Sequence, residues 1–94
     1  MKFEDIIWLD EVIEKLAQKH AVAPDEVEEA LASASRARFV QRGDWEGEDL
    51  YAAMGRTDAG RYLIVYYVRR RLGHALVISA RDMTEREKRA YGKK

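Results

Sequence analysis

The chain has 94 residues, no cysteine and a formal net charge of zero, with 47% hydrophobic and 36% charged side chains. This composition indicates one soluble folded domain over residues 1–94 and excludes a disordered chain. The lack of cysteine excludes disulfides, thiolate catalysis and cysteine-ligated metals, and it fits a cytoplasmic protein. No apolar run approaches the roughly 18 residues that span a bilayer, and the first residues show no signal peptide, so we expect no membrane association.

The zero net charge hides an asymmetry along the chain. Residues 1–35 carry three bases and nine acids, a net charge of −6, whereas residues 36–94 carry fourteen bases and eight acids, a net charge of +6. A basic half attracts nucleic acid or an acidic partner. The alternative is that the two halves fold together and neutralise each other.

The first third of the chain predicts two helices. Residues 3–8 are a candidate for an extra short strand. Apolar residues then recur at helical spacing, with Asp10 as a candidate N-cap, and predict an amphipathic helix over residues 10–20. Pro24 suits the first turn of a second helix, which the pattern ends near residue 34.

After Ser35 the hydrophobic period changes from that of a helix to that of a strand. The predicted strands cover residues 36–42, 50–56, 62–68 and 75–80. The third is almost continuously apolar and aromatic, which is typical of a central strand buried on both faces. The connections between strands are short, including a tight turn in which Gly60 can take positive φ, so neighbouring strands must run antiparallel.

The end of the chain predicts a third helix. Thr84 and Glu87 match the S/T-x-x-E capping box, and the helix covers residues 84–92. Helices followed by a run of strands predict an α+β fold. We expect two N-terminal helices on one face of a four-stranded antiparallel meander, and a C-terminal helix near the other face, which is left free for function.

The sequence contains no P-loop, no G-x-G-x-x-G and no H-E-x-x-H motif. His20 and His74 have no nearby carboxylates in a metal-binding pattern, so we expect neither a metal nor a cofactor. What remains is a set of arginines, tyrosines and acids with one helix-end histidine. Such a set binds phosphate, and it can also cleave RNA without metal, which needs a base for the 2′-hydroxyl, an acid for the leaving oxygen and cations for the phosphorane charge.

Four ordered pieces of the sequence carry a family resemblance. They are Lys19-His20-x-Val22, Gly47-Glu48, Gly60-Arg61-x-Leu63-x-Val65, and Ile78-Ser79-Ala80-Arg81-x-Met83-Thr84 followed by Glu87 and Tyr91. In this order and spacing they resemble the BrnT family, small ribonuclease toxins of type II toxin–antitoxin pairs with a RelE-like fold. The resemblance covers nearly the whole chain. It implies an endoribonuclease that acts on RNA, blocks translation and is held inactive by a cognate antitoxin in a hetero-oligomer. Ala23 departs from the pattern, since a capping Ser or Thr is expected before Pro24.

Two arginines are the first candidates for catalysis. Arg81 ends the last strand, where its guanidinium could brace a phosphate through two hydrogen bonds. The alternative is a salt bridge to Glu48 or to the C-terminal helix. Arg61 begins the neighbouring antiparallel strand, so we expect it near Arg81, where both arginines could share one phosphate. The alternative for Arg61 is a solvated turn residue.

The remaining candidates each have a structural alternative. His20, at the C-terminal end of the first helix, is a general acid or base, or a half-buried structural histidine. Glu48 is a base or positions one of the two arginines. Tyr91 stacks on a base, donates a proton, or packs the last helix on the sheet. The basic residues that we expect to bind the RNA backbone are Lys19, Arg69, Arg70 and Arg86. A non-catalytic module that binds nucleic acid or an acidic partner through the same surface remains the alternative function.

Overall fold

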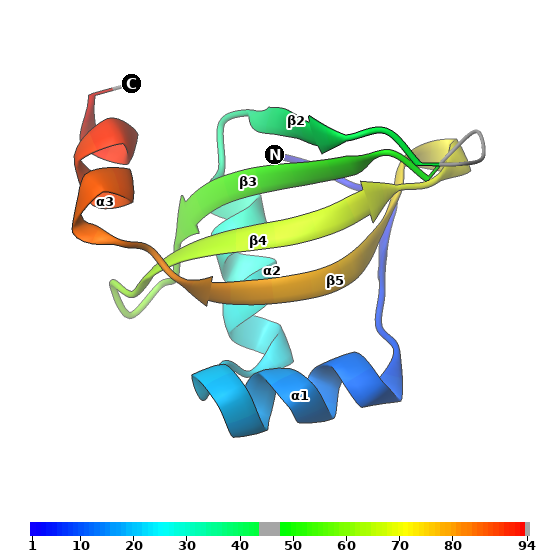
Figure 1. Ribbon diagram of the computed structural model, residues 1–94, viewed down its shortest axis with the longest axis horizontal. Coiled ribbons are helices and arrows are strands. Elements are labelled where there is room, and N and C mark those ends of the chain that lie inside the picture. The colour runs from blue at the N-terminus through cyan, green and yellow to red at the C-terminus, as the bar shows by residue number, and fades with distance from the viewer. Residues whose placement is uncertain (44–47, 94) are drawn as a thin grey trace.

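A computed structural model describes residues 1–43 and 48–93, which form one sheet and three α-helices (Figure 1). The helices are α1 (Asp10–His20), α2 (Pro24–Ser33) and α3 (Glu85–Gly92). The strands are β1 (Asp5–Ile7), β2 (Ala37–Gln41), β3 (Leu50–Arg56), β4 (Tyr62–Arg69) and β5 (His74–Asp82), with a short 3₁₀ turn, Arg71–Gly73, between the last two. Gly47, one of the residues that carry the family resemblance, lies outside the described residues.

The sheet has five strands in the order β1-β5-β4-β3-β2. Strands β2 to β5 form the antiparallel meander that the short turns predict. The expectation of a purely antiparallel, four-stranded sheet is wrong at one edge, where β1 pairs parallel to β5 and Asp5 lies opposite His74. Residues 8–73 lie between these two strands, and they supply the long connection that a parallel pair requires.

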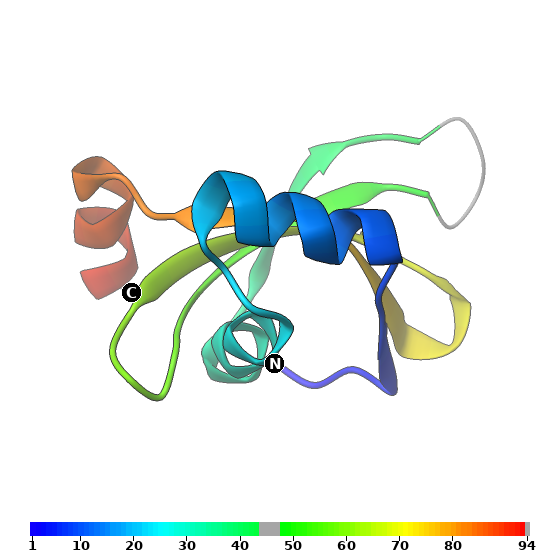
Figure 2. The same cartoon turned by 90° about the horizontal axis from the view of Figure 1, so that it is seen from below.

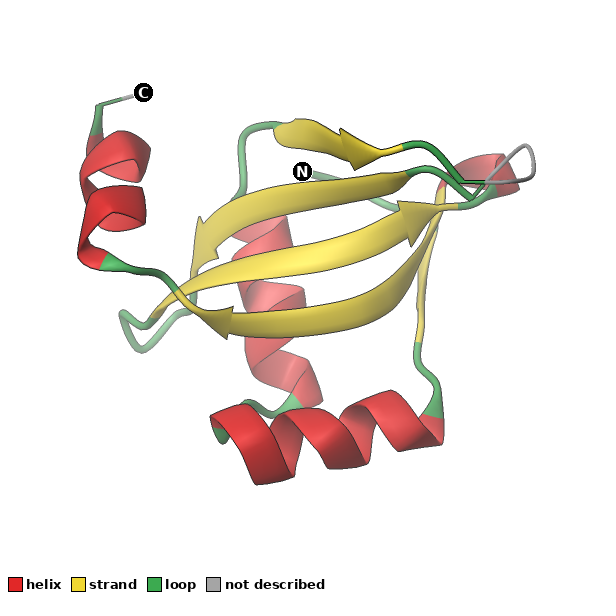
Figure 3. Ribbon diagram, in the orientation of Figure 1, coloured by secondary structure: helices red, strands yellow, loops and turns green. Residues whose placement is uncertain are grey.

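Helices α1 and α2 cover one face of the sheet, and α3 lies apart from them (Figure 2). α2 packs on β3 and β4, and α1 packs on β5. The core between these layers includes Leu16 and Leu31 from the helices and Val65 and Tyr67 from the central strand, each at most 1% exposed. The opposite face of the sheet, which we call the open face, carries neither α1 nor α2 (Figure 3).

The helix starts differ in detail from the prediction. α1 spans residues 10–20 as expected, but its N-cap is Leu9, which makes no side-chain capping bond, and Asp10 is the first helical residue. At the start of α2, the Ala23 amide donates to the Glu26 carboxylate at 3.0 Å. Glu26 therefore satisfies one free amide of a helix whose N-cap residue lacks the expected hydroxyl.

Gly55 marks the closest approach of α2 to the sheet. A side chain at this position would overlap the Ala30 carbonyl, and it would also crowd the Ser33 hydroxyl. That hydroxyl accepts a hydrogen bond from the Arg56 amide at 2.7 Å. A glycine in β3 thus lets the helix lie directly on the strand.

Alternation along β4 divides its side chains between the two faces. Leu63, Val65 and Tyr67 are buried under the helices, whereas Tyr62 and Tyr66 are half-buried on the open face. The expectation that this strand is buried on both faces holds at Ile64, which is 2% exposed, but not at the two tyrosines. The reason is that, among the helices in the described residues, α3 alone reaches the open face.

α3 begins at the predicted capping box. The Glu87 amide donates to the Thr84 hydroxyl at 3.1 Å, and the Thr84 amide donates to the Glu87 carboxylate at 2.8 Å. Met83, just before the helix, is 5% exposed, but α3 itself has no buried residue. Polar contacts therefore hold α3 to the sheet more than apolar packing does. No helix in the described ranges is long and apolar enough to cross a membrane.

Candidate functional site

Arg81 points to the open face and is held there by α3. Its Nη1 and Nη2 atoms donate to the two carboxylate oxygens of Glu87 at 2.8 and 2.9 Å. Nη2 also donates to the Tyr66 hydroxyl at 3.2 Å. This is the ion pair with the C-terminal helix that was the alternative for Arg81. The two-pronged geometry that fits a carboxylate also fits two oxygens of a phosphate.

The ion pair shifts the pKa of both partners. The hydrogen bond to Glu87 raises the pKa of Arg81, although partial burial opposes it. The hydrogen bond from Arg81 lowers the pKa of Glu87 to about 2, helped by the bond from the Thr84 amide and opposed by burial. Both groups are therefore charged at neutral pH, and Glu87 is a weak base while it remains paired.

A hollow of about 700 Å³ lies beside this pair, between α3, the open face and the start of β2. We call it the α3 pocket. Part of its wall is apolar and aromatic and is formed by Ala52, Met54, Ile64, Ala90 and Tyr91. Positive charge in the pocket comes from three arginines, Arg36, Arg38 and Arg86. In the strand register, Ile64 lies opposite both Arg81 and Met54, so the pocket and Arg81 are neighbours.

Tyr91 reaches the same part of the molecule from the last turn of α3. Its ring meets the ring of Tyr62 edge-on, with 5.9 Å between centroids. Tyr91 therefore packs α3 on the sheet, as its structural alternative predicts, and it also lines the pocket. The open face thus gathers Arg81, Glu87, Tyr66, Tyr91 and the three pocket arginines.

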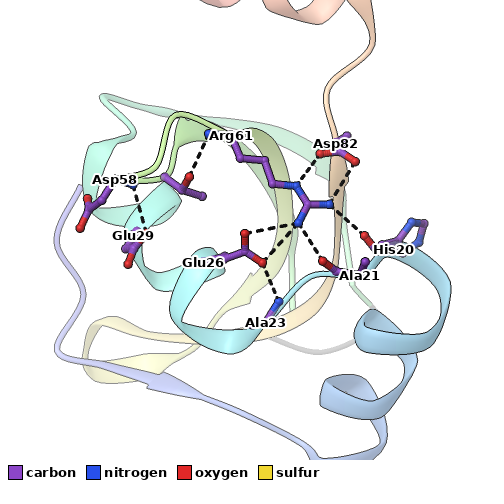
Figure 4. A network of polar contacts seen from close by, with 9 residues as sticks. His20, Ala21, Ala23, Glu26, Glu29, Asp58, Arg61 and Asp82 are labelled. Atoms are coloured by element: carbon purple, nitrogen blue, oxygen red, sulfur yellow. Dashed lines mark hydrogen bonds and ion pairs between the residues drawn. The ribbon is translucent and has the colours of Figure 1, made fainter.

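Arg61 lies on the other face and has a full set of partners (Figure 4). Its Nε and Nη2 atoms donate to the Asp82 carboxylate at 2.7 and 3.1 Å, and Nη1 donates to Glu26 at 3.2 Å. Nη1 and Nη2 also donate to the carbonyls of Ala21 and His20 at 2.8 and 2.9 Å. Arg61 therefore joins the end of α1, the start of α2 and the end of β5.

The expectation that Arg61 and Arg81 share a phosphate does not fit this arrangement. Asp82 follows Arg81 in β5, so their side chains point to opposite faces of the sheet. Arg61 pairs with Asp82 and is therefore on the helix side. The hydrogen bond to Asp82 raises the pKa of Arg61, and the same bond lowers the pKa of Asp82.

His20 and Lys19 belong to the Arg61 side. The His20 carbonyl is part of the network, and its ring points away from the Arg61 guanidinium (Figure 4). Ala21, which follows, has a left-handed backbone with φ 51° that ends α1. A cation beside the last carbonyls of a helix is favourable, so Arg61 stabilises this helix end. Lys19 is exposed in the last turn.

Glu48 lies at the opposite end of the sheet from both candidate arginines. Glu48 comes shortly before Leu50, the first residue of β3. Leu50 lies opposite Val68 of β4, and Val68 lies opposite Leu76 of β5. Arg81 is five residues further along β5 than Leu76. Five strand residues span about 16 Å. The expectation that Glu48 positions either arginine is therefore corrected. Arg69 and Arg70, at the end of β4, are exposed at this same far end.

Sequence reasoning missed several residues of the open face. Arg36 and Arg38 were assigned only to an edge strand, yet residues two apart in a strand share one face, and this spacing is the signal that could have placed them together. For Glu87 the sequence predicts a helix cap and a place in the family pattern, but not the ion pair with Arg81. Of the four predicted backbone-binding residues, only Arg86 lines the α3 pocket. Within residues 1–43 and 48–93, no three His, Asp or Glu side chains are grouped closely enough to hold a metal ion.

The fold is α+β, with one face of the sheet covered by helices and arginines gathered on the open face, and such a cationic surface suits an anionic ligand. The chain matches the family model described as the ribonuclease toxin BrnT of type II toxin–antitoxin systems over residues 8–87, and it belongs to this family. The 1.1 Å crystal structure of the Brucella abortus ribonuclease toxin BrnT has a similar fold, with a TM-score of 0.62 and 20% sequence identity. The match covers 86% of this chain and 97% of the Brucella chain. No curated protein sequence matches the chain.

Proposed function

We propose that this chain is an endoribonuclease toxin that cleaves RNA without a metal ion, blocks translation and is neutralised by a cognate antitoxin. Membership of the BrnT ribonuclease toxin family supports the proposal. The observation that carries it is the forked guanidinium of Arg81, which lies on the open face beside a pocket with three further arginines. These cations would offset the charge that develops on the phosphorane.

The ion pair of Arg81 suggests how a base becomes available. A phosphate that takes the same two-pronged position on Nη1 and Nη2 of Arg81 displaces the Glu87 carboxylate, because Glu87 accepts one hydrogen bond from each of these atoms there. Glu87 then loses the hydrogen bond that holds its pKa near 2, and its basicity rises toward that of an ordinary carboxylate. Substrate binding thus creates a stronger base next to the substrate. Tyr66 and Tyr91 are the hydroxyl groups on the same face that could protonate the leaving oxygen.

One observation favours the alternative, a non-catalytic binding module. Arg81 is occupied by Glu87, and His20 lies on the opposite face of the sheet from Arg81, with the Arg61 network. A surface of this kind could bind RNA or an acidic protein without cleaving anything. A ribonuclease and a binding module would both bind RNA, but only the ribonuclease would cleave it.

The deciding experiment is incubation of the purified chain with end-labelled RNA, with EDTA and with added Mg²⁺, and with and without ribosomes. We expect cleavage in EDTA, and cleavage by Arg81→Ala that is lower by about a hundredfold or more. Binding of RNA without cleavage under all these conditions would instead establish the alternative. A wild-type chain that neither binds nor cleaves RNA would exclude both.

The antitoxin is expected to cover the open face, where the cations face solvent. Arg61 and Arg81 lie on different faces, so one flat contact cannot cover both, and we assign the antitoxin to the Arg81 side. Opposite charge on the partner would steer association. Co-expression with the product of the adjacent gene in the cytoplasm should give one complex by size-exclusion chromatography and should restore growth.

A further inference from the structure

The α3 pocket is a space that packing of the helix on the sheet alone does not explain. A helix packed only for stability would fill the space beneath it with apolar side chains, because protein interiors are close-packed. α3 buries none of its residues, and a hollow of about 700 Å³ remains over Ala52, Met54 and Ile64. Ala90, which faces the hollow from α3, is itself exposed. The pocket is therefore open to solvent beside Ala90, whereas Ala52 and Ile64 at its floor are only 4% and 2% exposed.

The charges of the pocket define its ligand. Arg36, Arg38 and Arg86 contribute cations, Tyr91 contributes an aromatic ring, and Glu87 is the one acid among the described lining residues. Arginines next to an apolar floor fit a molecule that has a flat ring at one end and a phosphate at the other. A free phosphate would make no favourable contact with the apolar floor, and a purely apolar ligand would leave the three arginines without an anionic partner.

We infer that the α3 pocket holds one unpaired base of single-stranded RNA, with neighbouring phosphates on the arginines. The inference rests on the proposed ribonuclease function and specifies its substrate class. A base in a duplex is stacked and paired, so it cannot enter a hollow beneath a helix, whereas bases of single strands are free to be splayed out. The volume falls within the roughly 300–1,000 Å³ of ligand pockets. Since Arg81 lies opposite Ile64, a base in the pocket places a phosphate beside Arg81.

The first test uses the wild-type chain and a labelled RNA whose 2′-hydroxyls are methylated, so that it cannot be cleaved. We expect the single strand to bind roughly tenfold or more tightly than the duplex of the same sequence. Replacing one base at a time by an abasic linker should weaken binding roughly five- to 150-fold at one position, the value of one stacked base. Equal binding of single strand and duplex, or no position sensitive to base removal, would overturn the inference.

The second test fills the pocket. Ala90→Trp places an indole in the hollow, and Ala17→Trp is the matched control, an exposed alanine in the middle of α1 on the opposite side of the sheet. We expect Ala90→Trp to bind intact and abasic RNA equally weakly, and Ala17→Trp to behave as wild type. Normal discrimination by Ala90→Trp would overturn the inference. The wild-type abasic series decides the matter if Ala90→Trp fails to fold.

These outcomes separate the inference from the function on which it rests. A wild-type chain that cleaves RNA but ignores base removal retains the ribonuclease function and loses the base pocket. A chain that shows no interaction with RNA loses both.

Discussion

Arg81 has two competing uses for the same pair of N–H groups. In the structure they hold Glu87 and with it α3. In the proposed reaction they hold a phosphate. The carboxylate occupies the position that two phosphate oxygens would take, so the Glu87 side chain competes directly with the substrate for Arg81. The side chain therefore couples the position of a helix to the availability of a cation.

Replacing Arg81 should affect catalysis far more than stability. Arg81→Ala removes a cation from the proposed site, and we expect cleavage to fall about a hundredfold or more. The ion pair is partly solvated, so the loss in the free energy of unfolding should be about 1 kcal/mol or less. Arg81→Lys should restore only part of the activity, because an ammonium cannot make the two-pronged contact. Cleavage assays beside thermal melts measure both effects, and full activity in Arg81→Ala would exclude the proposed role.

Glu87→Gln should separate binding from cleavage. Removing the carboxylate leaves Arg81 free for phosphate, so we expect tighter RNA binding, by roughly two- to tenfold in Kd. The amide cannot take a proton, so cleavage at saturating RNA should fall. Glu85→Gln is the control, since Glu85 is on the same helix with its side chain 81% exposed. Weaker RNA binding by Glu87→Gln would show that Glu87 only positions Arg81.

At the scale of elements, α3 should respond to acid before the sheet does. The folded-state pKa of Glu87 is depressed from 4.5 to about 2, so its contribution to anchoring α3 is complete above pH 4.5 and is lost as the pH falls toward 2. NMR spectra across this range should show the amides of α3 approaching random-coil shifts, while those of Leu63 and Val65 stay native. Glu87→Gln lacks the titrating carboxylate, so α3 should show no such transition between pH 4.5 and 2. An α3 that stays docked at pH 2 would contradict this account.

The Arg61 network should contribute to stability. Arg61→Ala leaves Glu26 and Asp82 facing each other without a cation and removes donors from the end of α1, so we expect a loss of about 2 kcal/mol in the free energy of unfolding. Arg56→Ala, at the other side of the same turn, is the control and should cost far less, because the exposed Arg56 side chain lies over the Tyr62 ring and its backbone amide, which donates to Ser33, is retained. Urea denaturation compares the two variants. RNA cleavage by folded Arg61→Ala should remain.

Most elements could be predicted from the sequence, because each has a local signal. The limits of α1 and β3 match the hydrophobic periods, and Thr84 with Glu87 marks the start of α3. β1 could not be assigned a direction, since a three-residue strand has no local feature that selects a parallel partner. The site was harder to predict for a related reason. Arg81 and Asp82 are consecutive in β5, so their side chains point to opposite faces of the sheet. The order of residues in the chain does not show on which of these faces the Arg61 side chain lies.

At the scale of the whole molecule, the two halves of opposite charge occupy different places. The acidic half supplies α1 and α2, which cover one face, while β2 and α3, from the basic half, bring arginines to the open face. Partial neutralisation does occur, since Arg61 binds Glu26. The open face nevertheless keeps its cations, and the expectation of a basic binding surface applies to this side of the molecule.

This placement of charge predicts the salt dependence of RNA binding. Each contact between a cation and a phosphate of single-stranded RNA contributes about −0.7 to the slope of the logarithm of the association constant against the logarithm of salt concentration. Four such contacts, from Arg36, Arg38, Arg81 and Arg86, should therefore give a slope of about −2.8. Binding should then weaken roughly fiftyfold between 50 and 200 mM salt. Fluorescence anisotropy over this range measures the slope, and Arg38→Gln should reduce it by about 0.7. A flat response would show that backbone contacts are absent.

The parallel pairing of β1 with β5 affects how the chain folds. Asp5 lies opposite His74, so this contact closes a loop of 69 residues, while every other neighbouring pair of strands is joined by a short connection. Contacts of such long sequence separation form late and slow down folding. During synthesis, the first strand must therefore wait, unpaired, until the last strand has left the ribosome. The sheet becomes complete only after the first residues of β5 have left the ribosome, so the edge formed by β1 is added when strands β2 to β4 are already available for pairing.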